Sequence, residues 1–374
     1  MRIFSNFESG SINVVKAESA DDIQLTIPND NQSEFYQWFH FRLETTAGEP
    51  HSLKLLNLAK SAYPEGWDGY SVVASYDREE WFRIPADFDG DTLSFEVTPE
   101  HGSIYFAYFA PYSYGRHQDL LHHAQTHPLC RLDTLGQTLD GNDISLLTIG
   151  EPEPGKNIVW VIGRQHPGET MAEWFIEGLL ARLLDDTDTV GRALLGNSVF
   201  YVVPNMNPDG SIRGHLRTNA IGVNLNREWQ TPSMEKSPEV FLVREKMLET
   251  GIDLFLDVHG DEAIPYNFVA GSEGTPSYDE CRQELEQAFK QALTTITPEF
   301  QDEYGYDKDK PGEANLTVCS NWVAEQFRCL SYTVEMPFKD HNFQPDELYG
   351  WSPERSGVFG RDTLAAIHAV IDQV

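Results

Sequence analysis

Two histidines and a glutamate stand where buried strands are expected to end, and together they could bind a catalytic metal ion. His166 and Glu169 follow the apolar run 158–162, and His259 ends a second such run, 252–258. Two imidazoles and one carboxylate are a common ligand set of catalytic zinc sites, which leave the fourth position to water. The pattern therefore predicts one Zn²⁺ ion per chain and favours a hydrolase.

A second His-x-x-Glu pair, His259 and Glu262, means that spacing alone does not select the ligands. Context favours His166 and Glu169, because the turn-rich link 163–168 joins a strand to a segment whose apolar residues recur with helical spacing. Open α/β sheets bind ligands at such junctions. Taken alone, each histidine could equally be a loop residue bonded to backbone. We interpret Glu262 as a solvated loop residue. The alternatives are a carboxylate that contacts a metal ligand or one that contacts the substrate.

Polar residues between the two ligand segments suggest how a substrate could be held. A buried-type strand runs into a Pro/Asn/Asp/Gly turn over 198–210, and Arg217, Asn226 and Arg227 follow it. Arginine can bind a carboxylate through two parallel hydrogen bonds, and near a metal it can polarise a carbonyl oxygen. The alternative is that both arginines pair with some of the 59 acidic side chains.

A glutamate within an otherwise apolar strand is the candidate for a general base. Residues 330–338 have the pattern of a buried strand that contains Glu335 and then stops at a proline. A buried carboxylate is costly unless it is paired, neutralised or faces a site. We therefore expect Glu335 to take a proton from an attacking water.

Five motifs follow one another along the chain. They are His166-x-x-Glu169, Pro204-Asn-Met-Asn-Pro-Asp-Gly210, Asn226-Arg227, Asp257-Val-His259-Gly and Tyr-Thr-Val-Glu335. In this order they resemble carboxypeptidase A-like zinc metallocarboxypeptidases, and the chain is most similar to the cytosolic carboxypeptidase subfamily. Two upstream segments, 35–42 and 105–114, also resemble the β-sandwich domain and the junction that precede the catalytic domain in these enzymes.

The resemblance implies hydrolysis of C-terminal peptide bonds of peptides or proteins by a metal-activated water. One glutamate would act as general base, one arginine would polarise the scissile carbonyl, and an Asn-Arg pair would hold the terminal carboxylate. The implied residues are His166, Glu169 and His259 for the metal, Glu335 and Arg217 for catalysis, and Asn226 and Arg227 for substrate binding.

The resemblance does not settle side-chain specificity. Members that remove acidic residues place a basic residue in the stretch before the base glutamate, whereas 312–322 contains none. Removal of C-terminal glutamates is therefore left open. The mobile tyrosine of carboxypeptidase A is not assigned either, and Tyr304 and Tyr306 are the candidates.

Two alternatives to a peptidase are retained. The nearer is a zinc amidohydrolase of the aspartoacylase and succinylglutamate desuccinylase type, which acts on N-acyl amino acids with a similar ligand set and base. The other is a binding module that keeps the fold without turnover. The presence of a residue at every expected ligand and base position argues against this second alternative.

Length and pattern predict two domains. The chain has 374 residues, more than a single small core usually organises. Short strand-like runs separated by Asp, Gly and Pro predict an all-β sandwich domain over 1–115. Alternating strands and helices predict an α/β catalytic domain over 116–374, with a mixed doubly wound sheet and helices on both faces. Helices are expected over 172–184, 238–249, 278–293 and 363–372.

Composition excludes several kinds of partner. A formal net charge of −32 opposes binding to nucleic acid or to an anionic membrane. No run of eighteen apolar residues predicts a membrane span, and the start of the chain lacks a signal core, so a cytoplasmic location is expected. The four cysteines have no metal-type spacing and are expected to be reduced. Nothing in the sequence indicates the oligomeric state.

Overall fold

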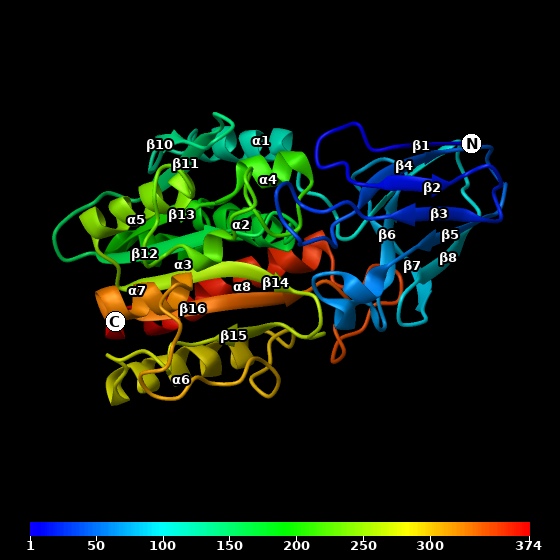
Figure 1. The fold of residues 1–374 in the computed structure, drawn as a ribbon. Coiled ribbons are helices and arrows are strands. Elements are labelled where there is room, and N and C mark those ends of the chain that lie inside the picture. Colours follow the sequence, from blue (N-terminus) through cyan, green and yellow to red (C-terminus); the bar gives the residue numbers. More distant parts are fainter.

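The computed structural model describes residues 1–374, in which an all-β part and an α/β part lie side by side (Figure 1). The all-β part contains nine strands in the order β1-β4-β9-β6-β7-β8-β5-β3-β2. The strands are β1 (Arg2–Phe4), β2 (Asn13–Lys16), β3 (Ile23–Thr26), β4 (His40–Glu44), β5 (His51–Leu55), β6 (Ser71–Ser75), β7 (Phe82–Phe88), β8 (Leu93–Val97) and β9 (Ser103–Ala107).

Strand β7 joins the two layers of the all-β part. Its first residues pair with β6, and residues 86–88 pair with β8. The chain therefore passes from one layer into the other within a single strand. Between the layers, Phe95 of β8 packs on Phe106 of β9 with ring centroids 5.5 Å apart. The predicted β-sandwich is confirmed.

The α/β part is built on a seven-stranded mixed sheet in the order β10-β11-β13-β12-β14-β16-β15. The four strands β13, β12, β14 and β16 run parallel to one another, and antiparallel strands flank them. The strands are β10 (Cys130–Gln137), β11 (Asp143–Ile149), β12 (Asn157–Gly163), β13 (Ser198–Val203), β14 (Leu254–Asp261), β15 (Phe268–Ala270) and β16 (Leu330–Pro337).

Helices cover both faces of this sheet, as the sequence predicts. Along β12, Val159 and Val161 belong to the core beneath α2, α6 and α8, whereas Trp160 and Ile162 belong to a second core beneath α5 and α7. No helix combines the length and the apolarity needed to cross a membrane. The helices are α1 (Tyr114–Ala124), α2 (Met171–Leu183), α3 (Thr189–Asn197), α4 (Pro208–Arg213), α5 (Pro238–Thr250), α6 (Glu280–Ile296), α7 (Cys319–Phe327) and α8 (Pro353–Val370).

The two parts share one continuous hydrophobic core. At their junction the ring of Tyr108 stacks on Phe338, with centroids 4.6 Å apart. The buried guanidinium of Arg83 in β7 donates to four backbone carbonyls, among them that of Phe338 at 2.9 Å. The expected boundary at 115/116 falls in the first turn of α1, and the division into two domains stays a prediction.

Candidate active site

Parallel strands bring the predicted metal ligands and the predicted base to one edge of the sheet. Strand β12 ends at Gly163, and His166 and Glu169 lie in the link that leads into α2. His259 lies near the end of β14, where it is the register partner of Glu335 in β16. Because β12, β14 and β16 are parallel, their carboxyl ends meet at this edge.

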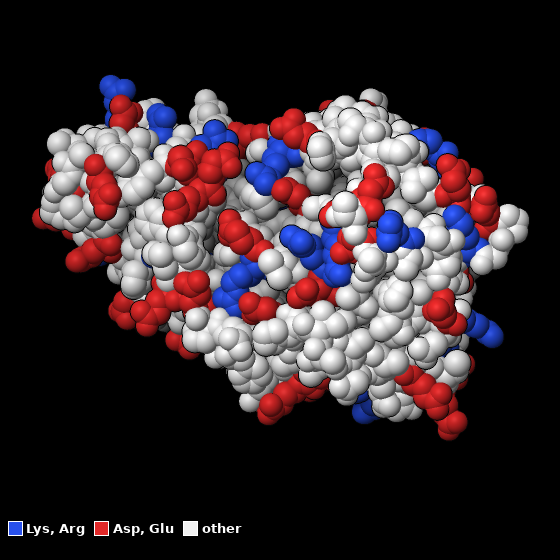
Figure 2. Space-filling view, turned by 180° about the vertical axis from the view of Figure 1, so that it is seen from behind, with Lys and Arg blue, Asp and Glu red and all other residues white.

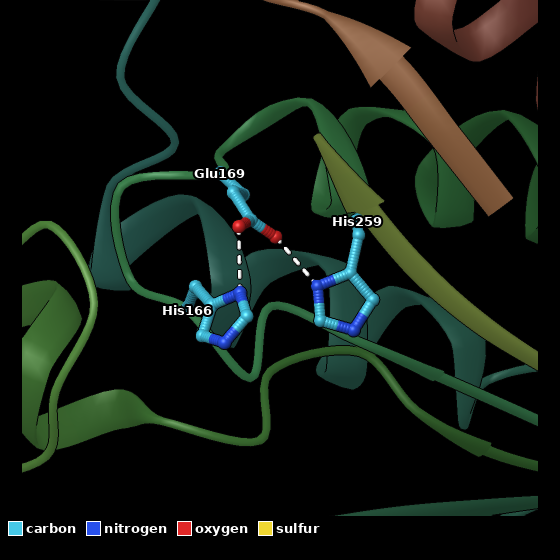
Figure 3. Close-up of side chains that lie close together, drawn as sticks. All are labelled: His166, Glu169 and His259. Atoms are coloured by element: carbon cyan, nitrogen blue, oxygen red, sulfur yellow. Dashed lines mark hydrogen bonds and ion pairs between the residues drawn. The ribbon is translucent and has the colours of Figure 1, made fainter. Parts of the chain in front are cut away.

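The carboxylate of Glu169 lies between the two histidines (Figure 3). Its Oε1 is 2.6 Å from Nδ1 of His166, and its Oε2 is 2.7 Å from Nδ1 of His259. All three side chains are buried, and one potential ligand atom from each lies within 4.8 Å of the others. The structure therefore places three metal-ligating groups around one point.

The outer nitrogens of both histidines have acceptors of their own. Nε2 of His166 lies 3.1 Å from Oδ1 of Asn224, and Nε2 of His259 lies 3.0 Å from Oδ2 of Asp257. When Nε2 of each histidine carries the proton, the lone pair on Nδ1 points at the carboxylate of Glu169. The lone pairs and the carboxylate repel one another unless a positive charge lies among the three groups. Two imidazole nitrogens and a carboxylate in this arrangement fit a zinc ion with an open position.

Burial and charge set the protonation of these groups. Burial, assisted by the positive charge of Arg217, lowers the pKa of His166 to about 4. Burial alone would raise the pKa of Glu169, but His166 and His259 outweigh it and lower that pKa. Burial likewise opposes the charged form of His259, but Asp257 and Glu169 raise its pKa well above the usual value. A cation that binds here must displace the proton from His259.

A buried ionic network holds the loop that carries the first two ligands. Arg164 has a left-handed backbone conformation (φ 56°), and its Nε donates to the carbonyl of Pro167 at 2.9 Å. Its Nη1 donates to Oε2 of Glu173 at 2.5 Å. The same carboxylate accepts from Asn205 at 3.0 Å, and its Oε1 lies 2.7 Å from Nδ1 of His117. Sequence reasoning missed this network, although an acidic residue on the apolar face of α2 was a signal for it.

We expect the Glu173→Gln substitution to destabilise the protein by about 3–5 kcal/mol, because it leaves the charge of Arg164 buried without its carboxylate. The matched control is Glu177→Gln on the same helix, where the carboxylate pairs with Arg116 and is partly exposed. An exposed ion pair typically contributes about 1 kcal/mol or less. Urea unfolding of both variants measures the difference, and equal losses would contradict the role assigned to the buried network.

Glu335 lines the cleft and has one carboxylate oxygen without a hydrogen-bond partner. Its side chain is buried, its Oε1 accepts from the hydroxyl of Tyr306 at 3.1 Å, and its Oε2 has no hydrogen-bond partner. Burial raises the pKa of Glu335 well above the usual value, and the charge of His259 opposes that rise. A carboxylate oxygen with no donor of its own can accept a proton from a molecule in the cleft.

Three residues that the sequence left uncertain have defined places in the structure. The hydroxyl of Tyr306 lies 2.7 Å from Asp261 as well as close to Glu335, whereas Tyr304 stacks on Tyr266 with centroids 4.6 Å apart. Glu262 is 5% exposed and lines the cleft. The interpretation of Glu262 as a solvated loop residue is therefore wrong, because the chain folds it back against the all-β part.

Neither Arg217 nor Arg227 forms an ion pair with a carboxylate, so the alternative that both pair with acidic side chains is wrong. Both line the cleft. The guanidinium of Arg217 lies over the rings of Phe35 and Tyr63, 5.7 and 5.3 Å from their centroids. Nη1 of Arg227 donates to the backbone carbonyl of Asn226 at 2.6 Å. Two positive charges therefore remain available to an anionic group in the cleft.

Asn226 contacts both His259, through its side chain, and Arg227, through its backbone carbonyl. Its Oδ1 accepts from the backbone N–H of Cys319 at 2.8 Å, which directs its Nδ2 toward the cleft, 3.4 Å from Nε2 of His259. The backbone N–H of Asn226 is held by Oδ1 of Asn224. The amide of Asn226 is thus fixed as a donor beside Arg227.

The cleft is a cavity of about 820 Å³, and two lysines line it in addition to the arginines. Each lysine is already paired, Lys290 with Asp302 and Lys308 with Glu273, both at 2.8 Å. The stretch 312–322 contributes only uncharged side chains to the lining. Acidic side chains also outnumber basic ones over the surface shown in Figure 2.

Comparison with known proteins identifies the chain. Residues 117–353 match the family model of zinc carboxypeptidases, and residues 3–109 match that of the cytosolic carboxypeptidase N-terminal domain. The chain belongs to the zinc carboxypeptidase family and is a metal-dependent peptide hydrolase. The peptidase interpretation is confirmed, and neither the amidohydrolase nor the binding module is supported by these matches.

Two solved structures resemble the chain over its whole length. The metallo-carboxypeptidase from Burkholderia cenocepacia is 50% identical with a TM-score of 0.98, and each chain is covered completely. The metallo-carboxypeptidase from Pseudomonas aeruginosa, in complex with (2-guanidinoethylmercapto)succinic acid, is 45% identical with a TM-score of 0.97 and equally complete coverage. Cytosolic carboxypeptidase 2 from Xenopus tropicalis is 28% identical over 92% of this chain, which spans only 40% of that protein's length.

Proposed function

We propose that the protein removes residues from the C-termini of peptides or proteins with one zinc ion held by His166, Glu169 and His259. Zinc, when bound, supplies a Lewis acid that lowers the pKa of water to roughly 7 and polarises a carbonyl. The observation that carries this proposal is the meeting of the three ligating groups with the unpaired oxygen of Glu335 at one edge of the sheet.

The protein's own residues move protons and hold the substrate. Glu335 accepts a proton from the attacking water at Oε2, which has no competing donor, and returns it to the leaving amine. Arg217 donates to the scissile carbonyl oxygen as negative charge develops there. Asn226 and Arg227 bind the terminal carboxylate, so only a chain end fits the site.

The binding of a terminal carboxylate is supported by the guanidinium of Arg227, which forms no ion pair with a carboxylate and lies beside the fixed amide of Asn226. The Pseudomonas aeruginosa protein is described in complex with a substituted succinic acid, a dicarboxylate. That ligand has the chemistry we propose for this end of the cleft. Specificity for the residue that is removed is not part of the proposal, because the residues of 312–322 that line the cleft, Val318, Ser320 and Asn321, are uncharged.

We expect Arg227→Ala to weaken the binding of substrates with a free C-terminus far more than that of the same peptides with an amidated C-terminus. The reason is that only the free carboxylate uses the guanidinium charge. The measurement is KM for each member of such peptide pairs, with Lys308→Ala as a matched control, because Lys308 also lines the cleft but is paired with Glu273. An equal rise in KM for peptides with free and with amidated C-termini would refute the binding of the terminal carboxylate by Arg227.

Digestion of a random peptide library tests the proposed function as a whole. The zinc-loaded protein should shorten peptides one residue at a time from the C-terminus, and mass spectrometry of the new ends would give the residue preference. N-acyl amino acids, offered in parallel, should remain intact. Internal cleavage, or hydrolysis of the N-acyl amino acids alone, would refute the proposal.

A further inference from the structure

The loop that carries Arg217 has no regular structure, yet a single carboxylate from the all-β part holds its backbone. The loop runs from Gly214, after α4, to Asn224, before the short 3-10 turn Leu225–Arg227. Asp30, which is 4% exposed, lies beneath it. Its Oδ2 accepts from the backbone N–H of Arg217 at 2.8 Å.

Asp30 also holds the neighbours of Arg217 on both sides. Its Oδ1 accepts from the N–H of Leu216 at 2.7 Å, and its Oδ2 accepts from the N–H and the hydroxyl of Thr218 at 2.9 and 3.0 Å. The carbonyl of Leu216 in turn accepts from the N–H of Gly168 at 2.8 Å, inside the link that carries the metal ligands. Three consecutive peptides are thus fixed by one anion, and the arginine loop is tied to the metal loop.

The side chain of Arg217 depends on the same part of the chain. Its guanidinium has no carboxylate partner and is flanked by the rings of Phe35 and Tyr63, both of which precede β6. Tyr63 also lines the cleft. The backbone and the side chain of Arg217 are therefore both positioned by residues of the all-β part.

We propose that the all-β part completes the catalytic site, and that Asp30 is the positioning residue that aims Arg217 at the scissile carbonyl. This inference rests on the role proposed above for Arg217. A misplacement of about 1 Å at a group that stabilises the transition state can cost a hundredfold in rate. Loss of Asp30 should therefore act on kcat through Arg217, without contact between Asp30 and the substrate.

Asp30 could instead serve only to join the two parts of the molecule. Asn31, which joins the same two parts, is the control that distinguishes this structural role from a positioning role. Nδ2 of Asn31 donates to the carbonyl of Ala220 at 2.7 Å, and its backbone N–H donates to Nε2 of His215 at 3.1 Å. Asn31 thus links the same two parts and the same loop, but it does not bind the peptides around Arg217. The Asn31→Ala variant should keep the kcat of the native enzyme.

The test is a double-mutant cycle on the full-length, zinc-loaded enzyme with a C-terminal peptide substrate. Asp30→Ala should lower kcat by about tenfold to a hundredfold, change KM much less, and retain one zinc per chain. In an Arg217→Ala background, Asp30→Ala should lower kcat no further, because both changes remove the same interaction. If Asp30→Ala folds poorly, Asp30→Asn, which keeps the side-chain volume and one carbonyl oxygen, should show an intermediate fall.

Two results would overturn the positioning role alone: native kcat in folded Asp30→Ala, or a loss that multiplies with that of Arg217→Ala. In either case a low kcat of the single variant Arg217→Ala would leave the proposed function intact. Native kcat in Arg217→Ala would refute the role of that arginine and the positioning role with it. A kcat loss in Asn31→Ala as large as that in Asp30→Ala would show that the contact is only structural.

Discussion

Replacement of Glu335 by Gln should lower kcat by a factor of at least about one hundred while one zinc per chain stays bound. The amide keeps the shape of the side chain but cannot accept the proton that the unpaired Oε2 is placed to receive. Steady-state hydrolysis of a C-terminal peptide gives kcat, and atomic absorption gives the zinc content. Near-native turnover with zinc present would refute the role of Glu335 as general base.

The control for this experiment is Glu262→Gln. Glu262 is as buried as Glu335 and lines the same cleft, and burial raises its pKa in the same direction. Its removal therefore reports the effect of a changed charge in the cleft without loss of the proposed base. A fall in kcat as large as that for Glu335→Gln would show that charge, and not proton transfer, explains the result.

Loss of a metal ligand should have the second large effect. We expect His259→Ala to retain little zinc and to lose nearly all hydrolysis, because two protein ligands remain where catalytic zinc sites use three. Added zinc should raise the Tm of the native chain, since a ligand that binds only the folded state stabilises it, and should leave the Tm of the variant unchanged.

His51→Ala is the matched control for the metal experiment. His51 is also buried, but it lies in β5 of the all-β part, where its Nε2 is 2.6 Å from Oγ1 of Thr45. Its zinc content and zinc-dependent Tm shift should equal those of the native chain. Full zinc occupancy and native turnover in His259→Ala would exclude His259 from the ligand set.

The convergence of the three predicted metal ligands could be foreseen from strand ends. Apolar runs mark buried strands, and parallel strands bring their carboxyl ends to one edge, where the structure places His166, Glu169 and His259 close together. The predicted range 172–184 differs by one residue at each end from α2, because the apolar spacing of that segment is regular. Helix α8 begins ten residues before the expected 363, where Ser352 caps a first turn opened by Pro353.

The residues that sequence reasoning missed act through contacts between distant segments. Asp30 binds a loop 186 to 188 residues away, and no local pattern marks it. Asp257 is part of a motif named from the sequence, but its contact with His259 was not predicted, although a carboxylate in an apolar strand two residues before a predicted ligand needs a partner. The 59 acidic residues leave pairing open as an alternative to the roles predicted for Arg217 and Arg227, because only the fold reveals what surrounds these two side chains.

The junction between the two parts also limits how a substrate enters. Many enzymes with two lobes open by swinging one lobe away on a hinge. Here such a swing would pull Tyr108 off Phe338 and leave the buried donors of Arg83 without acceptors, at considerable cost. The wall of the cleft that Tyr63 and Glu65 contribute is therefore held in place against the other lining residues when a substrate enters. Any widening of the cleft would have to come from the loops of the α/β part that form the rest of its lining.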